Sequence, residues 1–164
     1  MSMSSRVRLA LVAAALIPVA AAGQPAGEKK DPPVSGLFKG NGKEAKLAYA
    51  SAHKGEPISD KPTIVLTFTE KDHSQEKKPR VKATFGDFGS ALIVTVTHDG
   101  QVVGCEVAHA AHKKSGFSAI GVVKTSDFKI ADGKVKGKLS TDGEQDTFGE
   151  KWEVKLEFAV KAPW

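Results

Sequence analysis

The sequence predicts an all-β fold, either an antiparallel β-sandwich or a closed barrel of about eight strands. From Val34 onward apolar and polar residues alternate with a period of two, and no stretch shows the period of a helix. Three dipeptides typical of tight hairpin turns separate the alternating runs. The chain has 164 residues, of which 40% are hydrophobic and 26% charged, as in one folded domain of ordinary size.

Residues 1–22 precede this pattern and are typical of a secretory signal peptide. Arg6 and Arg8 supply positive charge, and an apolar run from Leu9 ends in three alanines, small residues that suit cleavage after Ala22. The run is shorter than the roughly 20 residues of a membrane span. We therefore expect cleavage, export to the periplasm or the extracellular space, and no transmembrane segment in the mature chain. An uncleaved N-terminal anchor is the alternative.

Residues 23–33 follow the expected cleavage site and contain turn formers and charges but almost nothing to bury. This composition predicts a flexible leader. Residues 34–164 then form the single all-β domain.

Three hairpin turns are expected, at Asn41-Gly42, Asp99-Gly100 and Asp132-Gly133. These residue types accept the positive φ angles that a two-residue type I′ turn requires. The strands expected beside them are Val34–Lys39, Lys43–Ala50, Leu92–Thr97, Gln101–His109, Asp127–Ile130 and Lys134–Leu139.

The remaining strands are expected in alternating runs without such turns, the clearest of which is Lys151–Lys161. There Trp152, Leu156 and Phe158 share one face, while charged residues occupy the other, as in a sheet with one side in water. The other such runs are Thr63–Thr69, Arg80–Phe85 and Phe117–Lys124.

Two segments resist pairing into tight turns and are expected as exposed loops. Ser51–Pro62 contains His53, Gly55 and two prolines, and Glu70–Pro79 is rich in charge. Exposed loops on a rigid scaffold often contain binding residues, and plain solubilising loops are the alternative.

The charge pattern argues against a nucleic-acid partner. The formal net charge is +5, but Arg6 and Arg8 fall in the segment expected to be removed, which leaves Arg80 as the one arginine of the domain. Nucleic-acid readers favour arginine, because its planar fork pairs with phosphate and guanine.

No catalytic motif is complete in this sequence. The run Gly116-Phe117-Ser118-Ala119-Ile120-Gly121 approaches a nucleophile elbow, but its second glycine comes one place late. Neither a His-Glu-x-x-His pair nor a phosphate-binding glycine loop occurs. We therefore expect no enzyme activity and no cofactor.

Cysteine and histidine supply the candidate ligands. Cys105 is the single cysteine and is expected to be buried, with pairing between two chains as the alternative. His109 and His112 face opposite sides on a strand but the same side on a helical turn. Together with His98, brought over by the Asp99-Gly100 hairpin, they are the candidate metal ligands, and ordinary surface histidines are the alternative.

These observations predict an exported, soluble, non-enzymatic β-domain with a binding or accessory role in the cell envelope, where its partner is an unidentified macromolecule. One alternative is a carrier that holds a small apolar ligand inside a barrel, and another is a histidine-based metal-binding protein. The aromatic residues suit the lining of a barrel and the filled core of a sandwich equally. They are Phe38, Tyr49, Phe68, Phe85, Phe88, Phe117, Phe128, Trp152 and Phe158.

Overall fold

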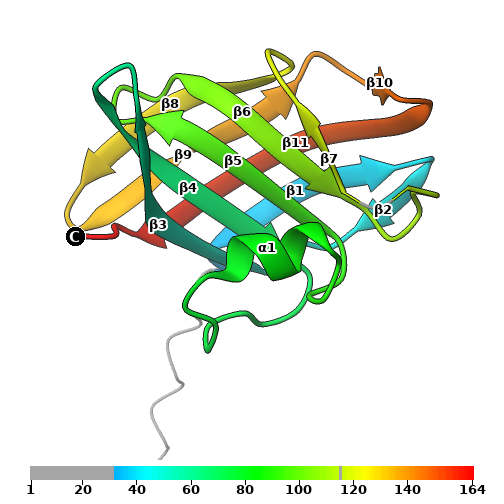
Figure 1. Cartoon of the computed structure of the whole chain (residues 1–164), viewed down its shortest axis with the longest axis horizontal. Coiled ribbons are helices and arrows are strands. Elements are labelled where there is room, and N and C mark those ends of the chain that lie inside the picture. Colours follow the sequence, from blue (N-terminus) through cyan, green and yellow to red (C-terminus); the bar gives the residue numbers. More distant parts are fainter. Residues whose placement is uncertain (1–31, 115) are drawn as a thin grey trace, which may run out of the picture. The chain divides into compact units, whose positions relative to one another are not determined.

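The computed structural model describes residues 32–114 and 116–164. The expected signal peptide, and all of the expected leader except Pro32 and Pro33, lie outside these residues. Within the described part, two antiparallel sheets face each other across a common apolar core (Figure 1). The all-β prediction is therefore confirmed, and the arrangement is sandwich-like rather than a closed barrel.

The first sheet has the strand order β2-β1-β11-β9-β8, and β10 pairs with one end of β11. The long C-terminal strand lies at its centre. Its strands are β1 (Val34–Gly40), β2 (Lys43–Ala45), β8 (Val123–Ala131), β9 (Lys134–Thr141), β10 (Gln145–Thr147) and β11 (Glu150–Lys161).

The second sheet has the order β3-β4-β5-β6-β7, so each strand pairs with its neighbour in the sequence. A short helix lies in front of this sheet in Figure 1. The elements are β3 (Tyr49–Ile58), β4 (Lys61–Thr69), α1 (Pro79–Thr84), β5 (Ala91–Thr97), β6 (Val102–Ala108) and β7 (Phe117–Ala119).

Side chains from both sheets fill the space between them. Trp152, Phe38 and Phe68 are at most 1% exposed, and the rings of Phe68 and Phe158 meet edge to face with centroids 5.4 Å apart. Such aromatic packing contributes directly to the stability of a core. The hypothesis of a ligand enclosed by a barrel is thus corrected, because the sheet does not close and aromatic side chains occupy the interior.

Two of the three expected turns have the expected geometry. Asn41 and Gly42 both have positive φ, as do Asp132 and Gly133, which fits type I′ turns. At the third turn only Gly100 has positive φ, and the Thr97 amide donates to the Gln101 carbonyl oxygen, 2.9 Å away. This hairpin is therefore wider than a type I′ turn.

The segment Ser51–Pro62 was expected as a loop and is instead a hairpin of β3 and β4. Its turn is formed by Ser59 and Asp60, both with positive φ. Pro57 fits within β3 because β3 is an edge strand, where an amide donor on the open side is not needed.

The segment Arg80–Phe85 was expected as a strand and is instead the body of α1. Pro79 is its first residue, a position where the missing amide costs nothing and the fixed φ favours a helix. Ala83 is fully buried against the outer face of the second sheet, in a small apolar cluster with Val65 and Ile93.

The expected strand Phe117–Lys124 is divided between the two sheets. β7 ends at Ala119, Gly121 turns the chain with a φ of 77°, and β8 begins at Val123 in the other sheet. Within residues 32–114 and 116–164, no helix has the length and apolar character needed to cross a membrane.

Candidate functional site

A groove with a volume of about 660 Å³ lies on the outer face of the second sheet, and we call it the outer groove. Strand register builds its floor, since Thr67 pairs with Ile93 and Ile93 with Glu106 in one row. In the next row Val65 pairs with Thr95. The volume falls within the roughly 300–1,000 Å³ typical of small-molecule sites.

Exposed apolar side chains surround this floor. Ile58 at the end of β3 is 40% exposed, Val81 on α1 is 61% exposed, and Ile120 after β7 is 80% exposed. All three line the outer groove. A gathering of large apolar side chains around one hollow is typical of a binding surface.

Thr67 lies at the base of the outer groove. Its side chain is fully buried, and its hydroxyl has no hydrogen-bond partner among the described residues. A buried hydroxyl without a partner costs about 1–3 kcal/mol.

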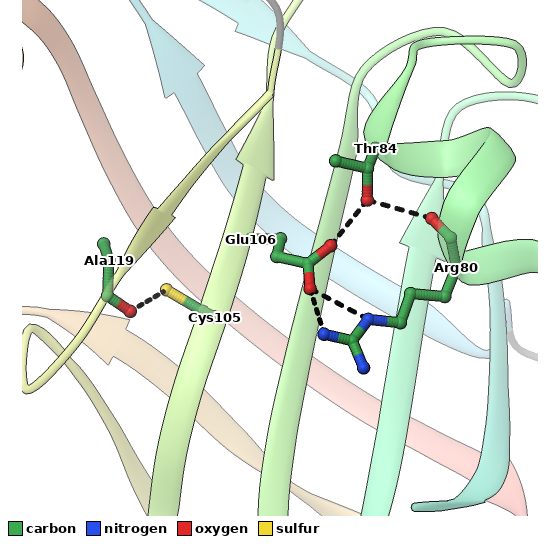
Figure 2. A network of polar contacts seen from close by, with 5 residues as sticks. All are labelled: Arg80, Thr84, Cys105, Glu106 and Ala119. Carbon is green, nitrogen blue, oxygen red and sulfur yellow. Dashed lines mark hydrogen bonds and ion pairs between the residues drawn. The ribbon is translucent and has the colours of Figure 1, made fainter.

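An ion pair holds α1 to β6 at the edge of the groove (Figure 2). The Arg80 Nε donates to Glu106 Oε1 over 2.8 Å, and the Arg80 Nη2 donates to the same oxygen. The Thr84 hydroxyl donates to Glu106 Oε2 over 2.6 Å. Both carboxylate oxygens of Glu106 are therefore occupied, and the charge of Arg80 is balanced locally.

Cys105 neighbours Glu106 on β6, but its side chain points the other way, toward Ala119 of β7 (Figure 2). The thiol is buried and lies 3.3 Å from the Ala119 carbonyl oxygen, to which it donates. Burial raises the pKa of the Cys105 thiol to about 12. The expected burial is confirmed, and a thiol in this state is a poor nucleophile.

Beside the groove, a chain of hydrogen bonds connects β3 to the loop that precedes α1. The Thr69 hydroxyl donates to the Lys71 carbonyl oxygen over 2.7 Å, so it accepts from His73 Nδ1 over 2.6 Å. His73 Nε2 is then unprotonated and accepts from the Ser51 hydroxyl over 2.8 Å. Ser51 lies 3.3 Å from His53 Nε2, and His53 lines the outer groove.

This network predicts that the domain loses stability between pH 7 and pH 5. Burial lowers the pKa of His73 below its ordinary value, so the folded state resists protonation. Above roughly pH 6.5 the residue is neutral in both states. As the pH falls below that value, the unfolded chain takes up the proton first and is favoured, until the lower folded pKa is reached. Urea unfolding at several pH values measures the slope.

His73→Gln provides the matched comparison for this prediction. The variant should be less stable than the wild type at pH 7, because two hydrogen bonds of the buried ring are disturbed. It should also lose less stability on going to pH 5. An unchanged pH slope in the variant would contradict the role given to His73.

His109 and His112 lie together in the turn that follows β6. The His112 amide donates to the His109 carbonyl oxygen over 2.9 Å, and the ring centroids are 5.3 Å apart. His109 Nδ1 accepts from the Ala111 amide, which leaves the proton of the neutral ring on Nε2. His112 Nε2 lies 3.1 Å from the Lys151 carbonyl oxygen, to which it donates. His112 Nδ1 thus retains the one lone pair that this arrangement offers to a metal ion.

The third candidate ligand, His98, lies elsewhere. It precedes β6, whereas His109 follows β6, and its ring packs against Trp164 with centroids 5.0 Å apart. Among the described residues, no three histidine, cysteine or acidic side chains gather in a metal-binding arrangement. The histidine metal site stays a prediction, with only His109 and His112 brought together.

A buried carboxylate fixes the turn that contains these two histidines. Glu150 Oε1 accepts from the amides of Lys113 and Lys114, and Glu150 Oε2 accepts from the Asn41 side chain over 2.6 Å. The Asn41 contact and the two amides hold the pKa of Glu150 below its ordinary value. The position of His112 thus depends on residues far away in the sequence.

The outer groove was not predicted from the sequence. A signal was present, because positions 64–66 and 92–94 are continuous apolar runs, which are typical of strands covered on both faces. Val65 and Ile93 therefore had to lie beneath something on the outer face.

Comparisons with protein-family models, with curated proteins and with solved structures find no match for this chain.

Proposed function

We propose that this chain is an exported, non-enzymatic binding domain of the cell envelope, and that the outer groove holds its ligand, a small molecule with an apolar body. The observation that carries the proposal is the gathering of Ile58, Val81 and Ile120 around one open groove. They are three of the seven large apolar side chains that are exposed among the described residues, so the groove concentrates apolar surface that water disfavours.

The proposal changes the place expected for an apolar ligand. The interior between the sheets is filled by side chains such as Trp152 and Phe68, whereas the groove on the outer face is open. Arg80 and Glu106 neutralise each other there, which favours a binding role over proton transfer. Export rests on the pattern of residues 1–22 alone.

Substitution of Ile120 tests the groove directly. Ile120→Asp should weaken binding of a neutral apolar dye such as Nile red by about tenfold or more, because the ligand must then bury a carboxylate. Stability should change little, because Ile120 is 80% exposed. Fluorescence titration measures the affinity, and urea unfolding checks the fold.

Phe148→Asp is the matched control, because Phe148 is 69% exposed and lies outside the groove. This variant should keep the dye affinity of the wild type. Equal affinity in all three proteins, or no dye binding by the wild type, would overturn the proposal. Retention of an envelope protein by the wild type and by Ile120→Asp alike would favour a macromolecular partner at another surface.

The export part is checked on protein isolated from its own compartment. Its intact mass should correspond to a chain that begins after Ala22. A full-length mass would contradict cleavage without affecting the outer groove.

A further inference from the structure

We infer that the ligand of the outer groove is an anionic amphiphile, a single apolar chain that ends in a carboxylate. This inference rests on the proposed function and adds a charge to the ligand. It follows from the charged side chains that share the groove with its apolar rim, and from their distribution between the two ends.

Positive charge predominates at the groove. Lys54, Lys77 and Lys78 line it, are exposed, and form no ion pair with a described residue. The opposing carboxylates are Glu56, which also lines the groove without an ion pair, and Glu106, which Arg80 already neutralises. Lys54 pairs with Ile64 of the inward face, so Lys77 and Lys78 are the two uncompensated cations on the side of the groove floor. They outnumber the one uncompensated anion, Glu56, and such an excess attracts a negative group.

The two lysines lie at one end of the outer groove. Lys77 and Lys78 directly precede Pro79, the first residue of α1, so they mark the end of the groove beside the helix. Ile58 is the last residue of β3, where it pairs with Lys61 across the β3–β4 turn, two residues after Glu56. A carboxylate near Lys77 and Lys78 would let an apolar chain run over Val65 and Thr95 toward Ile58.

Lysine suits this role because its ammonium group is a mobile point charge on a long apolar stem. The stem covers apolar surface while the charge stays in water and meets an anionic head at the mouth of a groove. Exposed charge contacts of this kind are individually weak and sensitive to salt. Most of the affinity should therefore come from the apolar chain, and the lysines should select the head group.

The test compares decanoate with 1-decanol, below their aggregation limits, as competitors of bound Nile red. Wild-type protein should bind decanoate about five- to tenfold more tightly than 1-decanol at low salt, and the preference should shrink at high salt. The double variant Lys77→Gln/Lys78→Gln should lose the preference and keep its affinity for 1-decanol. Lys77 and Lys78 are both exposed, so the fold should be unaffected.

The double variant Lys134→Gln/Lys136→Gln is the matched control. It removes the same charge from β9 of the first sheet, where neither lysine lines the outer groove, and it should keep the preference for decanoate. Equal binding of both compounds by the wild type, or an equal loss in both double variants, would overturn the anionic head group and leave the groove in place. Binding of neither compound, or binding of both by Ile120→Asp as by wild type, would overturn the proposed function itself.

Discussion

Replacing Trp152 by alanine is expected to lower the free energy of unfolding by about 3–5 kcal/mol. The indole is 1% exposed and lies on the inward face of β11, at the centre of the first sheet. Its ring meets that of Phe117 at a centroid distance of 6.3 Å, which joins the two sheets. Alanine would leave a cavity that the packed strands on both sides cannot close.

The polar atom of the indole adds to this effect. Trp152 Nε1 donates to the Thr147 hydroxyl over 3.0 Å, which fixes the short strand β10 against β11. Trp152→Phe keeps much of the volume and loses this bond, so it should be destabilised less than Trp152→Ala. The difference between the two variants separates packing from hydrogen bonding.

Urea unfolding measures these stabilities, and tryptophan itself reports them. The chain has two tryptophans, and Trp164 is 55% exposed, so Trp164→Ala is a control that should stay close to wild type. Trp152 emission should shift to longer wavelength on unfolding. A loss below about 1 kcal/mol in Trp152→Ala would contradict the placement of this residue in the core.

Alternation along single strands was the part of the fold that could be predicted from sequence. In β11 the residues Trp152, Leu156 and Phe158 are buried as expected, and in β9 Val135 and Leu139 are buried between exposed lysines. This works because the side-chain period of a strand depends only on local geometry. The alternation of polar and apolar residues then shows directly which face of a strand meets water and which face packs in the core.

The helix α1 shows where local pattern was insufficient. Arg80-Val81-Lys82-Ala83 alternates like a strand, yet only Ala83 is buried and Val81 is 61% exposed. Over six residues, a strand and one and a half turns of helix place apolar residues almost equally well. Packing on the outer face of the second sheet, together with Pro79 at the first helical position, decides between them.

The candidate site was beyond the reach of single-strand reasoning for a different reason. The outer groove combines β3, β4, β5 and β6 with α1, so it exists only once strand order and register are fixed. The sequence shows that Val65 and Ile93 are apolar on a face expected to be polar. It does not show that Ile120, after the last strand of the sheet, lies on the rim of the same hollow.

Gly36→Ala is expected to destabilise the domain by about 2–4 kcal/mol. Gly36 lies within β1 with a φ of +122°, a conformation that L-residues with a side chain rarely adopt. A Cβ there would stand 2.1 Å from the Lys155 carbonyl oxygen of β11. Because that oxygen belongs to a strand backbone, it cannot move away like the end of a flexible side chain.

Two other glycines separate the contributions of conformation and space. Gly42 has a φ of +78° but nothing within 4 Å of a Cβ, so Gly42→Ala should show only the conformational cost of about 1 kcal/mol. Gly104 on β6 has neither a left-handed φ nor a close neighbour, and Gly104→Ala should be nearly neutral. Urea unfolding of the three variants should rank them in that order, with Gly36→Ala the least stable. If Gly36→Ala were no less stable than Gly42→Ala, the close approach of β1 to β11 would be contradicted, because conformation alone would then explain both effects.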